Sequence, residues 1–373
     1  MRTKPHALCI GAGAVGRGLI APKLIDAGFM VTFYDVDKNV IDRLDQMKYY
    51  PLVGRGVFKW IGPIGVYDEQ DLICMENDFD YIFVSVKANN LSIVADTIRY
   101  IIENNQKKSI VYIIENLNDA AEKFSGMLND VDVNDITVLN GIANVVVPIS
   151  PHQEQDPTFT VYDPNMELVL EKTKDAPFIN TARYVNEDEF NFEWLMKFYL
   201  HCSVHAFVAY WGIQNNFEYI HEVVTSSPHD AIVSGFIKMI STAMKVHYPD
   251  NAKEIDDRGK FEFKCMADHL MMDDVYRVAR DPIRKLEYDE RLIGLLYFLR
   301  ISLGNFICDH DSYVKLVQMT NNAIDCAGLT PDSLLGEDFW QELPDATFDT
   351  FYYGVIEELR NDWTERFSHN TNS

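Results

Sequence analysis

The chain has 373 residues, of which 47% are hydrophobic and 24% charged, so it is long enough for two globular domains. Its formal net charge of −24 disfavours nucleic acid and anionic membranes as partners, because both are polyanions. No apolar stretch reaches the length of a membrane span, and the glycines from Gly11 to Gly18 interrupt any signal-like apolar core. The six scattered cysteines lack CxxC spacing, which predicts a reduced, cytoplasmic protein with no metal site.

The first twenty residues predict a strand, a tight glycine turn and a helix. The apolar run His6–Ile10 precedes the sequence GAGAVG. In this pattern Gly11 permits the turn, Gly13 lets the backbone approach a pyrophosphate, and Gly16 lets the helix pack close to the strand. The N-terminus of the helix then offers unpaired N–H groups to the phosphates. The residues expected to form this cofactor-binding turn are Gly11, Gly13, Ala14, Val15 and Gly16.

The second predicted strand, Met30–Tyr34, ends at an acid that indicates the type of cofactor. Asp35 lies 19 residues after Gly16, where a carboxylate binds the adenosine ribose hydroxyls and repels the extra phosphate of NADP. Asp37 is the near alternative, although we expect it to cap the helix over residues 38–48. The order of strand, turn, helix, strand and acid therefore predicts a cofactor site for NAD.

Strands and helices alternate through the first half of the chain. This alternation predicts a mostly parallel sheet with right-handed crossovers, in a Rossmann-type α/β domain over residues 1–187. We also expect residues 158–162 and 166–170 to form an appended hairpin around the turn Asp163-Pro164-Asn165. The other expected elements are a hairpin near residues 54–65, strands at 81–86, 110–114, 136–139 and 143–147, and a helix at 91–103.

The hydrophobic period changes from about residue 188, and the rest of the chain predicts a mainly α-helical domain over residues 188–373. The expected helices cover residues 193–211, 230–247, 291–307, 312–327 and 349–367.

Polar residues lie at or near the ends of several predicted strands. Ligands bind at the carboxyl ends of parallel strands, so these positions are candidates for a site. We assign Ser85 and Lys87 to the cofactor, and we treat Asn116 and Asn144 as candidates for contact with a ligand. The alternative for each of the four is a capping or turn residue.

The segment from Lys197 to His205 carries the clearest candidates for catalysis. At about 100° per residue of an α-helix, His201 and His205 lie within about 80° of Lys197, and Cys202 lies about 140° away. A lysine near other cations in a partly apolar cleft has a lowered pKa, which suits it as the base for an alcohol that loses hydride to NAD. A neighbouring histidine would orient the hydroxyl. The alternative is that the Lys197 side chain extends to solvent and that the two histidines are core residues whose hydrogen bonds are made within the protein.

A basic block later in the chain offers anion recognition. Arg277, Arg280 and Arg284 would share a helical face if Pro282 did not break the helix, and Lys285 follows. Guanidinium groups suit phosphate because they form forked hydrogen bonds. The alternative is that these arginines pair with neighbouring acids within the block.

Three blocks of sequence resemble the long-chain mannitol dehydrogenase family of polyol dehydrogenases, and within it the enzymes for mannitol 1-phosphate. They are GAGAVGRGLI with the following DAGFMVTFYDVD, the segment Lys197–His205, and DDVYRVARDPIRKLEYDERL over Asp273–Leu292. The resemblance implies a metal-independent NAD(P) enzyme in which Lys197 is the base, His205 orients the substrate and Asn116 stabilises the alkoxide. It further implies a polyol or sugar phosphate as the small-molecule partner, with mannitol 1-phosphate and fructose 6-phosphate as the default pair.

Two positions depart from the family pattern. The family places an asparagine five residues after the lysine, where this chain has Cys202, and an Asp-Arg pair where this chain has Asn144-Val145. A thiol is a poor hydrogen-bond donor, and loss of one donor from such a site costs about a hundredfold in rate. We therefore expect Asn144, His201 and Cys202 to line the substrate site. The alternatives are an unphosphorylated hexitol or hexuronate as substrate, a hydroxy-acid dehydrogenase, or a nucleotide-binding relative without catalysis. The oligomeric state is left open.

Overall fold

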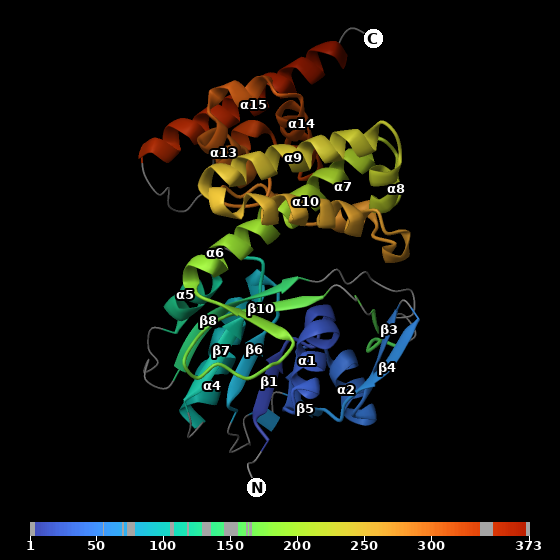
Figure 1. Cartoon of the computed structure of the whole chain (residues 1–373), viewed down its shortest axis with the longest axis vertical. Helices are drawn as coiled ribbons and strands as arrows, with labels where there is room; N and C mark the ends of the chain where they lie inside the picture. Colours follow the sequence, from blue (N-terminus) through green and yellow to red (C-terminus); the bar gives the residue numbers. More distant parts are fainter. Residues whose placement is uncertain are drawn as a thin grey trace. The chain divides into compact units, whose positions relative to one another are not determined.

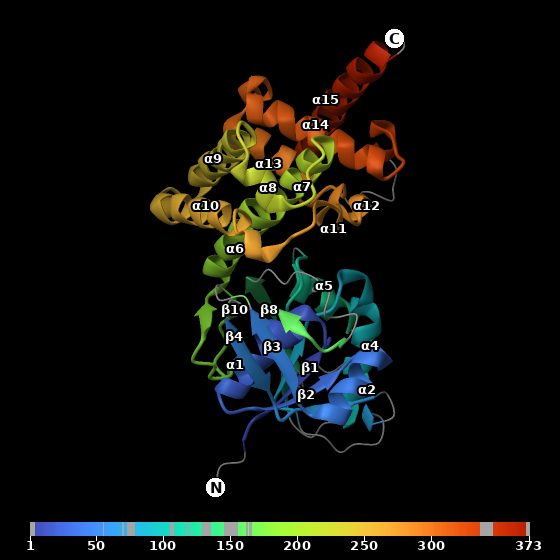
Figure 2. The same cartoon turned by 90° about the vertical axis from the view of Figure 1, so that its right-hand side faces the viewer.

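The structure, a computed structural model, divides into two compact units, Met1–Asn191 and Phe192–Ser373 (Figures 1 and 2). The division falls four residues after the one expected from the sequence, within helix α6 (Glu187–Leu195). The described residues are 4–54, 56–68, 71–72, 79–104, 108–117, 119–128, 136–144, 156–161, 163, 166–335 and 346–370.

The first unit is built on an eight-stranded sheet with the order β11-β10-β8-β7-β6-β1-β2-β5. All neighbouring pairs are parallel except β10 with β8, as the predicted Rossmann-type fold requires. The strand order reverses between β1 and β6, which is where such sheets bind nucleotides. The strands of this sheet are β1 (His6–Ile10), β2 (Met30–Tyr34), β5 (Gly65–Tyr67), β6 (Tyr81–Val84), β7 (Ser109–Ile113), β8 (Ile136–Asn144), β10 (Glu167–Glu171) and β11 (Ala182–Val185).

Helices cover both faces of this sheet, because alternate residues of each strand are apolar on opposite sides. Ala7 and Cys9 of β1 pack in the same cluster as Leu24 of α1. Leu8 of β1 packs in a second cluster with Ile98 of α4. The helices of this unit are α1 (Ala21–Asp26), α2 (Lys38–Met47), α4 (Leu91–Asn104) and α5 (Ala120–Met127), with the short turns η1 (Gly16–Ile20) and η2 (Ala88–Asn90).

The predicted appended hairpin is wrong, because its two strands belong to different sheets. β9 (Thr160–Val161) pairs in parallel with β3 (Tyr50–Gly54), which forms the expected hairpin with β4 (Val57–Ile61). β10 instead pairs antiparallel with β8. Leu168, Val169 and Leu170 are all fully buried, and a strand with both faces buried belongs inside a covered sheet rather than in a two-stranded ribbon. Pro164 and Asn165 of the predicted turn lie outside the described residues.

One further expectation for the sheet is also corrected. The two strands predicted at 136–139 and 143–147 are a single strand, β8, which continues through Gly141 as far as Asn144. A Cβ at Gly141 would lie 2.8 Å from the Ile114 side chain, so the glycine serves close packing here rather than a turn. Residues 145–147 lie outside the described residues.

The second unit is helical, as predicted, and packs around one large hydrophobic cluster. The helices predicted at 230–247, 312–327 and 349–367 are present within three residues at their ends. The one predicted at 193–211 lies within a run of three helical elements over residues 187–214, and 291–307 divides into an α-helix and a 3-10 turn. The elements are η4 (Met196–Ser203), α7 (Val204–Gln214), α8 (Ile220–Thr225), α9 (His229–His247), η5 (Pro249–Asn251), α10 (Ala252–Met266), η6 (His269–Met271), α11 (Val275–Ala279), α12 (Pro282–Lys285), α13 (Ile293–Leu303), η7 (Asn305–Asp309), α14 (Asp311–Cys326), η8 (Pro331–Leu335) and α15 (Ala346–Asn370).

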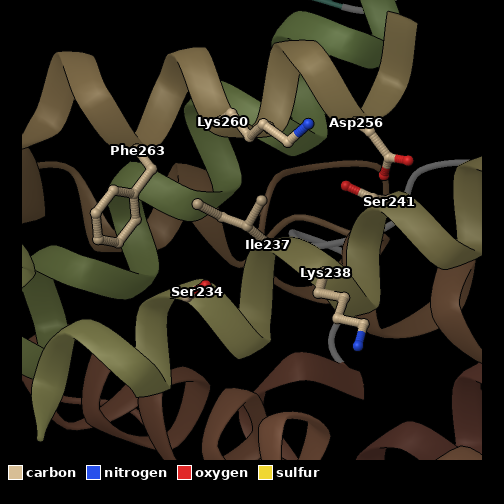
Figure 3. Close-up of a pocket in the computed structure, with 8 residues that line it drawn as sticks. Ser234, Ile237, Lys238, Ser241, Asp256, Lys260 and Phe263 are labelled. Atoms are coloured by element: carbon tan, nitrogen blue, oxygen red, sulfur yellow. The ribbon is translucent and has the colours of Figure 1, made fainter. Parts of the chain in front are cut away.

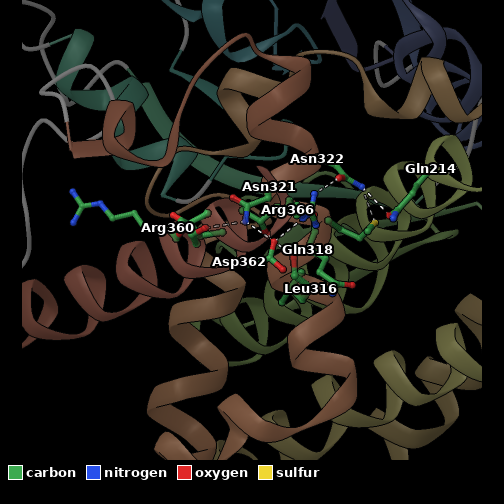
Figure 4. Close-up of polar contacts among 12 residues, drawn as sticks. Gln214, Leu316, Gln318, Asn321, Asn322, Arg360, Asp362 and Arg366 are labelled. Carbon is green, nitrogen blue, oxygen red and sulfur yellow. Dashed lines mark hydrogen bonds and ion pairs between the residues drawn. The ribbon is translucent and has the colours of Figure 1, made fainter. Parts of the chain in front are cut away.

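A polar network attaches the last helix to this bundle (Figure 4). Asn321 of α14 is fully buried, and its Nδ2 donates to the Leu359 carbonyl at 3.0 Å and to Asp362 Oδ2 at 2.8 Å on α15. Arg366 extends the network by donating to Asn322 Oδ1 at 2.7 Å. Buried polar groups of this kind are costly when a partner is removed, so the network fixes the register of α15 on α14.

The substitution Asn321→Ala should destabilise the protein, because it removes the buried amide that donates to the Leu359 carbonyl and to Asp362. We expect the free energy of unfolding to fall by about 1–3 kcal/mol, as measured by urea denaturation of the full chain. Asn322→Ala is the matched control, since its contacts lie nearer to solvent and should contribute less than about 1 kcal/mol. Equal effects of the two variants would contradict a core role for Asn321.

Candidate active site

The glycine turn after β1 has the geometry of a phosphate-binding loop. Gly11 has a φ of 101°, and a Cβ there would lie 2.5 Å from the Ser85 carbonyl oxygen. A Cβ at Gly16 would lie 2.2 Å from the Gly11 carbonyl oxygen, so both positions require glycine. A Cβ at Gly13, in contrast, would meet no atom within 4 Å. The backbone at Gly13 is therefore open to a ligand, which fits the predicted approach of a pyrophosphate.

Asp35, which follows β2, contacts the glycine turn. Its Oδ2 accepts a hydrogen bond of 2.7 Å from the Ala12 N–H, and its Oδ1 accepts one of 3.0 Å from the Asp37 N–H. Asp37 caps α2 by accepting from the Asn39 N–H at 3.0 Å, as expected. Asp35 is thus held at the end of β2, beside the glycine turn, in the position that a ribose-binding carboxylate requires.

Ser85 and Lys87 follow β6 on the other side of the reversal in strand order. Ser85 Oγ donates to the Gly11 carbonyl at 3.3 Å, so this side chain braces the glycine turn. Lys87 is exposed at the start of η2. Both residues follow the carboxyl end of β6, Ser85 contacts the glycine turn, and their assignment to the cofactor stays a prediction.

The two candidate asparagines differ in their surroundings. Asn144, at the end of β8, donates from Nδ2 to Glu167 Oε2 at 3.1 Å, and Glu167 also accepts from Arg183 Nε at 3.0 Å. The side-chain amide of Asn144 thus donates to a neighbouring strand of the sheet. This contact fits the alternative interpretation, in which Asn144 has a structural role. Asn116 is half-buried just beyond β7, at the carboxyl edge of the sheet.

The segment with the catalytic candidates is wound as a π-helix rather than the expected α-helix. The turn η4 spans Met196–Ser203 and continues into α7. Its hydrogen bonds run from residue i to i+5, so each turn holds more residues than the about 3.6 of an α-helix. This winding brings the buried Cys202 closer to the face of Lys197 than the α-helical spacing predicts. Such π-helical turns occur frequently at functional sites.

His201 is held by a buried carboxylate from another helix. Its Nδ1 lies 2.7 Å from Oε2 of Glu262 on α10, and the other carboxylate oxygen accepts from Arg258 Nε at 2.6 Å. Glu262 is 2% exposed. Burial alone would raise its pKa, but the charges and hydrogen bonds of His201 and Arg258 outweigh this effect and lower the pKa to about 2. Glu262 is therefore a carboxylate at neutral pH.

His205 has a similar partner one turn further along. Its Nε2 lies 3.2 Å from Oδ2 of Asp273, and Oδ1 of Asp273 accepts from Arg277 Nε at 2.8 Å. Burial would raise the pKa of Asp273, but His205 and Arg277 lower it below its usual value. The rings of His201 and His205 contact each other edge to face, with centroids 4.9 Å apart. Two histidines, each backed by a carboxylate and an arginine, thus adjoin on one helix.

The basic block does not form one helical face. α11 ends at Ala279, Asp281 has a left-handed backbone with a φ of 56°, and Pro282 begins α12. Arg277 is paired with Asp273, and Arg280 Nε donates to the Arg277 carbonyl at 3.0 Å. The helix is interrupted before Pro282, which was the condition under which the arginines would not share one helical face.

A smaller cationic cluster remains around Glu290, which is 4% exposed. Arg291 Nε donates to Glu290 Oε2 at 2.9 Å, and Arg284 Nη1 lies 3.5 Å from Oε1. Lys285 is buried beside them, and burial together with the charges of Arg291 and Arg284 lowers its pKa to about 7. The Arg291 guanidinium also lies 5.8 Å from the ring centre of Phe198, next to Lys197. This cluster therefore carries more positive than negative charge and packs against the η4 segment.

A groove of about 380 Å³ lies between α9 and α10, apart from these residues (Figure 3). Ile237 and Phe263 supply its apolar wall, while Lys238 and Lys260 flank it. At about 100° per residue, the groove-lining positions of α10 lie about 60° to 160° around the helix from Glu262. The groove and the histidine pair thus use different faces of α10. Among the described residues, no cluster of His, Cys, Asp and Glu has the makings of a metal site, and no helix is long and apolar enough to cross a membrane.

Comparisons with known proteins fit this arrangement. Mannitol-1-phosphate 5-dehydrogenase of Caldanaerobacter subterraneus subsp. tengcongensis is 27% identical over 308 residues, which cover 78% of this chain and 80% of the relative. The Mycoplasma pneumoniae protein of the same name is 23% identical over 353 residues, covering 91% and 92%. The chain is thus similar, over most of its length, to proteins named mannitol-1-phosphate 5-dehydrogenase.

Two further comparisons concern the fold and the first unit. The structure of Pseudomonas fluorescens mannitol 2-dehydrogenase in complex with NAD and D-mannitol has a TM-score of 0.66 at 14% identity, covering 100% of this chain and 95% of that one. Residues 7–146 match the ketopantoate reductase PanE/ApbA family. That match ends within the first unit, whereas the similarity to mannitol dehydrogenase family members extends over most of the chain.

The sequence analysis missed the residues that hold the histidines. Glu262 and Arg258 are 61 and 57 residues beyond His201 in the sequence, on a helix that was not predicted. Their only local signal is the i,i+4 spacing of an arginine and a glutamate, which is common on solvated helices. Asp273 and Arg277 share this spacing and were counted as part of the basic block.

Gly13→Ala tests the cofactor loop. The new methyl group meets no protein atom but occupies the space that the backbone leaves open, so stability should be unchanged while NADH binding weakens about tenfold or more. Thermal unfolding and titration of NADH fluorescence measure the two effects. Gly126→Ala, which also has open space around its Cβ but lies on α5, is the control and should alter neither by much. Unchanged NADH binding in Gly13→Ala would contradict the assigned loop.

Proposed function

We propose that this protein is an NAD-dependent dehydrogenase that interconverts a polyol, in its phosphorylated form, and the corresponding ketose. The observation that carries the proposal is the π-helical segment with Lys197, in a chain similar over most of its length to mannitol-1-phosphate 5-dehydrogenases. The default substrate pair is mannitol 1-phosphate and fructose 6-phosphate.

The first unit supplies a binding site that fits a dinucleotide. The open backbone at Gly13 and the positive φ of Gly11 suit a pyrophosphate, and Asp35 suits the ribose hydroxyls of NAD rather than the phosphate of NADP. When bound, the nicotinamide supplies the acceptor for hydride. Ser85 keeps the loop in shape by its contact with Gly11.

In the second unit, Lys197 serves as the base that accepts the proton of the alcohol. Lys197 lies in η4 beside the buried Phe198, and its charge is near enough to lower the pKa of His201. His205 orients the hydroxyl, and the contact of its Nε2 with Asp273 fixes the plane of its ring. Asn116 is assigned to the alkoxide by the resemblance to the family, while Cys202 replaces the second amide donor.

The cluster of Arg284, Lys285 and Arg291 is the best candidate for the substrate phosphate. In a chain with a net charge of −24, a phosphorylated substrate needs a local concentration of positive charge. Arg291 and Arg284 contact the buried carboxylate of Glu290, and Lys285 lies close enough for the charges of both arginines, Asp281 and Glu290 to act on its pKa. The contact of Arg291 with Phe198 connects the cluster to the catalytic segment.

Lys197→Ala should abolish most of the turnover, because the alcohol then lacks its proton acceptor. We expect kcat with NADH and fructose 6-phosphate to fall by about 10²–10⁴-fold, while NADH binding stays as in the wild type. Lys238→Ala on α9 is the matched control and should retain full activity. Full turnover of Lys197→Ala would reject the base and, with it, the proposed mechanism.

The phosphate assignment predicts a dependence on pH. The pKa of Lys285 is lowered to about 7, so its ammonium form is present below that pH and is lost as the pH rises through it. The KM for fructose 6-phosphate should therefore rise above pH 7, whereas any KM for fructose should not. Arg284→Gln should raise the KM for fructose 6-phosphate about tenfold. The control Arg360→Gln, which breaks an exposed pair with Asp332, should not. Equal changes for fructose and fructose 6-phosphate would contradict a phosphate site here.

A further inference from the structure

The surroundings of His201 define the direction in which this side chain can transfer a proton. A carboxylate only accepts hydrogen bonds, and Glu262 is ionised, so the 2.7 Å contact places a proton on Nδ1 of His201. Burial, reinforced by His205 and Lys197, lowers the pKa of His201 despite the opposing effect of Glu262. At neutral pH the ring is therefore neutral, and its Nε2 carries a lone pair that accepts a proton.

The charged groups that face His201 come from two elements. Lys197 and His205 lie on its own helix, and Lys197 is near enough for its charge to lower the pKa of His201. Glu262 and Arg258 face it from α10. The His201 side chain is also 20% exposed, whereas that of Glu262 is only 3% exposed. His201 thus lies about one helical turn from Lys197 in η4 and is itself partly open to solvent.

We propose that the Glu262–His201 pair is a proton relay, through which Lys197 exchanges its proton with solvent in each turnover. The proposal rests on the proposed function. In polyol oxidation, the substrate carbon gives its hydride to the nicotinamide, and the hydroxyl gives its proton to the Lys197 amine. The Lys197 ammonium then passes a proton to Nε2 of His201, and the imidazolium releases a proton to water. Glu262 stabilises the transient imidazolium, and ketose reduction reverses these steps.

The relay explains why a charged pair is buried at this place. A buried carboxylate is costly unless it is paired and hydrogen-bonded, and Arg258 alone would satisfy its charge. The additional contact with His201 is useful if the ring gains positive charge during the reaction, as in other carboxylate–histidine pairs. His201 is a positioning and relay residue, since it acts on Lys197 and not on the substrate.

Chemical rescue of a cavity variant tests the relay. In the full-length enzyme, His201→Ala should lower kcat for polyol oxidation at pH 7 about 100-fold, with NADH binding unchanged. Added imidazole should restore much of this loss, because the free base occupies the cavity and accepts the proton. His247→Ala on α9 is the control, because His247 is also a hydrogen-bonded histidine, and it should neither lose activity nor respond to imidazole.

A second pair of variants separates the relay from simple packing. His201→Gln keeps most of the side-chain volume but has no site that exchanges a proton, and Glu262→Gln removes the charge that stabilises the imidazolium. Both should lose at least about tenfold in kcat, and neither should respond to imidazole because neither leaves a cavity. If His201→Ala does not fold, the kcat of His201→Gln decides: full activity overturns the relay.

The remaining outcomes are equally decisive. An undiminished kcat in His201→Ala, or a loss that imidazole does not restore, overturns the relay while the proposed function stands. A wild-type protein that turns over no polyol or ketose overturns the proposed function and the relay together. Loss and rescue confined to His201→Ala, with the control unaffected, support the relay.

Discussion

A charge that is buried in a protein must be met by a partner, and this requirement organises the helical unit. Glu262 is buried between Arg258 and His201, and Asp273 is buried beside His205 and Arg277. Each carboxylate comes from a part of the chain distant in sequence from the histidine it contacts. The contacts therefore attach α10 and the start of α11 to the η4–α7 helix, and they fix the rings beside Lys197. The packing of these helices and the proposed chemistry therefore depend on the same two carboxylate–histidine pairs.

The sequence was most informative where local geometry decides the structure. The glycines at 11, 13 and 16 and the acids at 35 and 37 could be picked out because they follow the spacing of a strand–turn–helix–strand unit. The parallel sheet and the helical second half followed from the hydrophobic period. The hairpin at 158–170 was wrong, because the partner of a strand depends on burial of both its faces, which a turn motif does not report.

The candidate site could be predicted only in part. The residue types on the Lys197 segment were visible, but the π-helical winding was not, since apolar spacing alone does not distinguish it from an α-helix. The carboxylates that contact the two histidines, Glu262 and Asp273, lie 61 and 72 residues beyond His201, so no local pattern indicates them. Likewise, Pro282 decides that the arginines divide between different partners, and the surviving cluster includes Arg291, which the sequence analysis had not chosen for the substrate.

NADH consumption by the purified wild-type protein tests the proposed activity most directly. Fructose 6-phosphate is compared with fructose and with keto-uronates as substrates. We predict turnover with fructose 6-phosphate and little with fructose, because the cluster around Glu290 offers its charge to a phosphate. Turnover restricted to an unphosphorylated ketose or a uronate would contradict the phosphate assignment. NADH that binds without turnover of any of these substrates would contradict the central claim that Lys197 and its histidines form an active site.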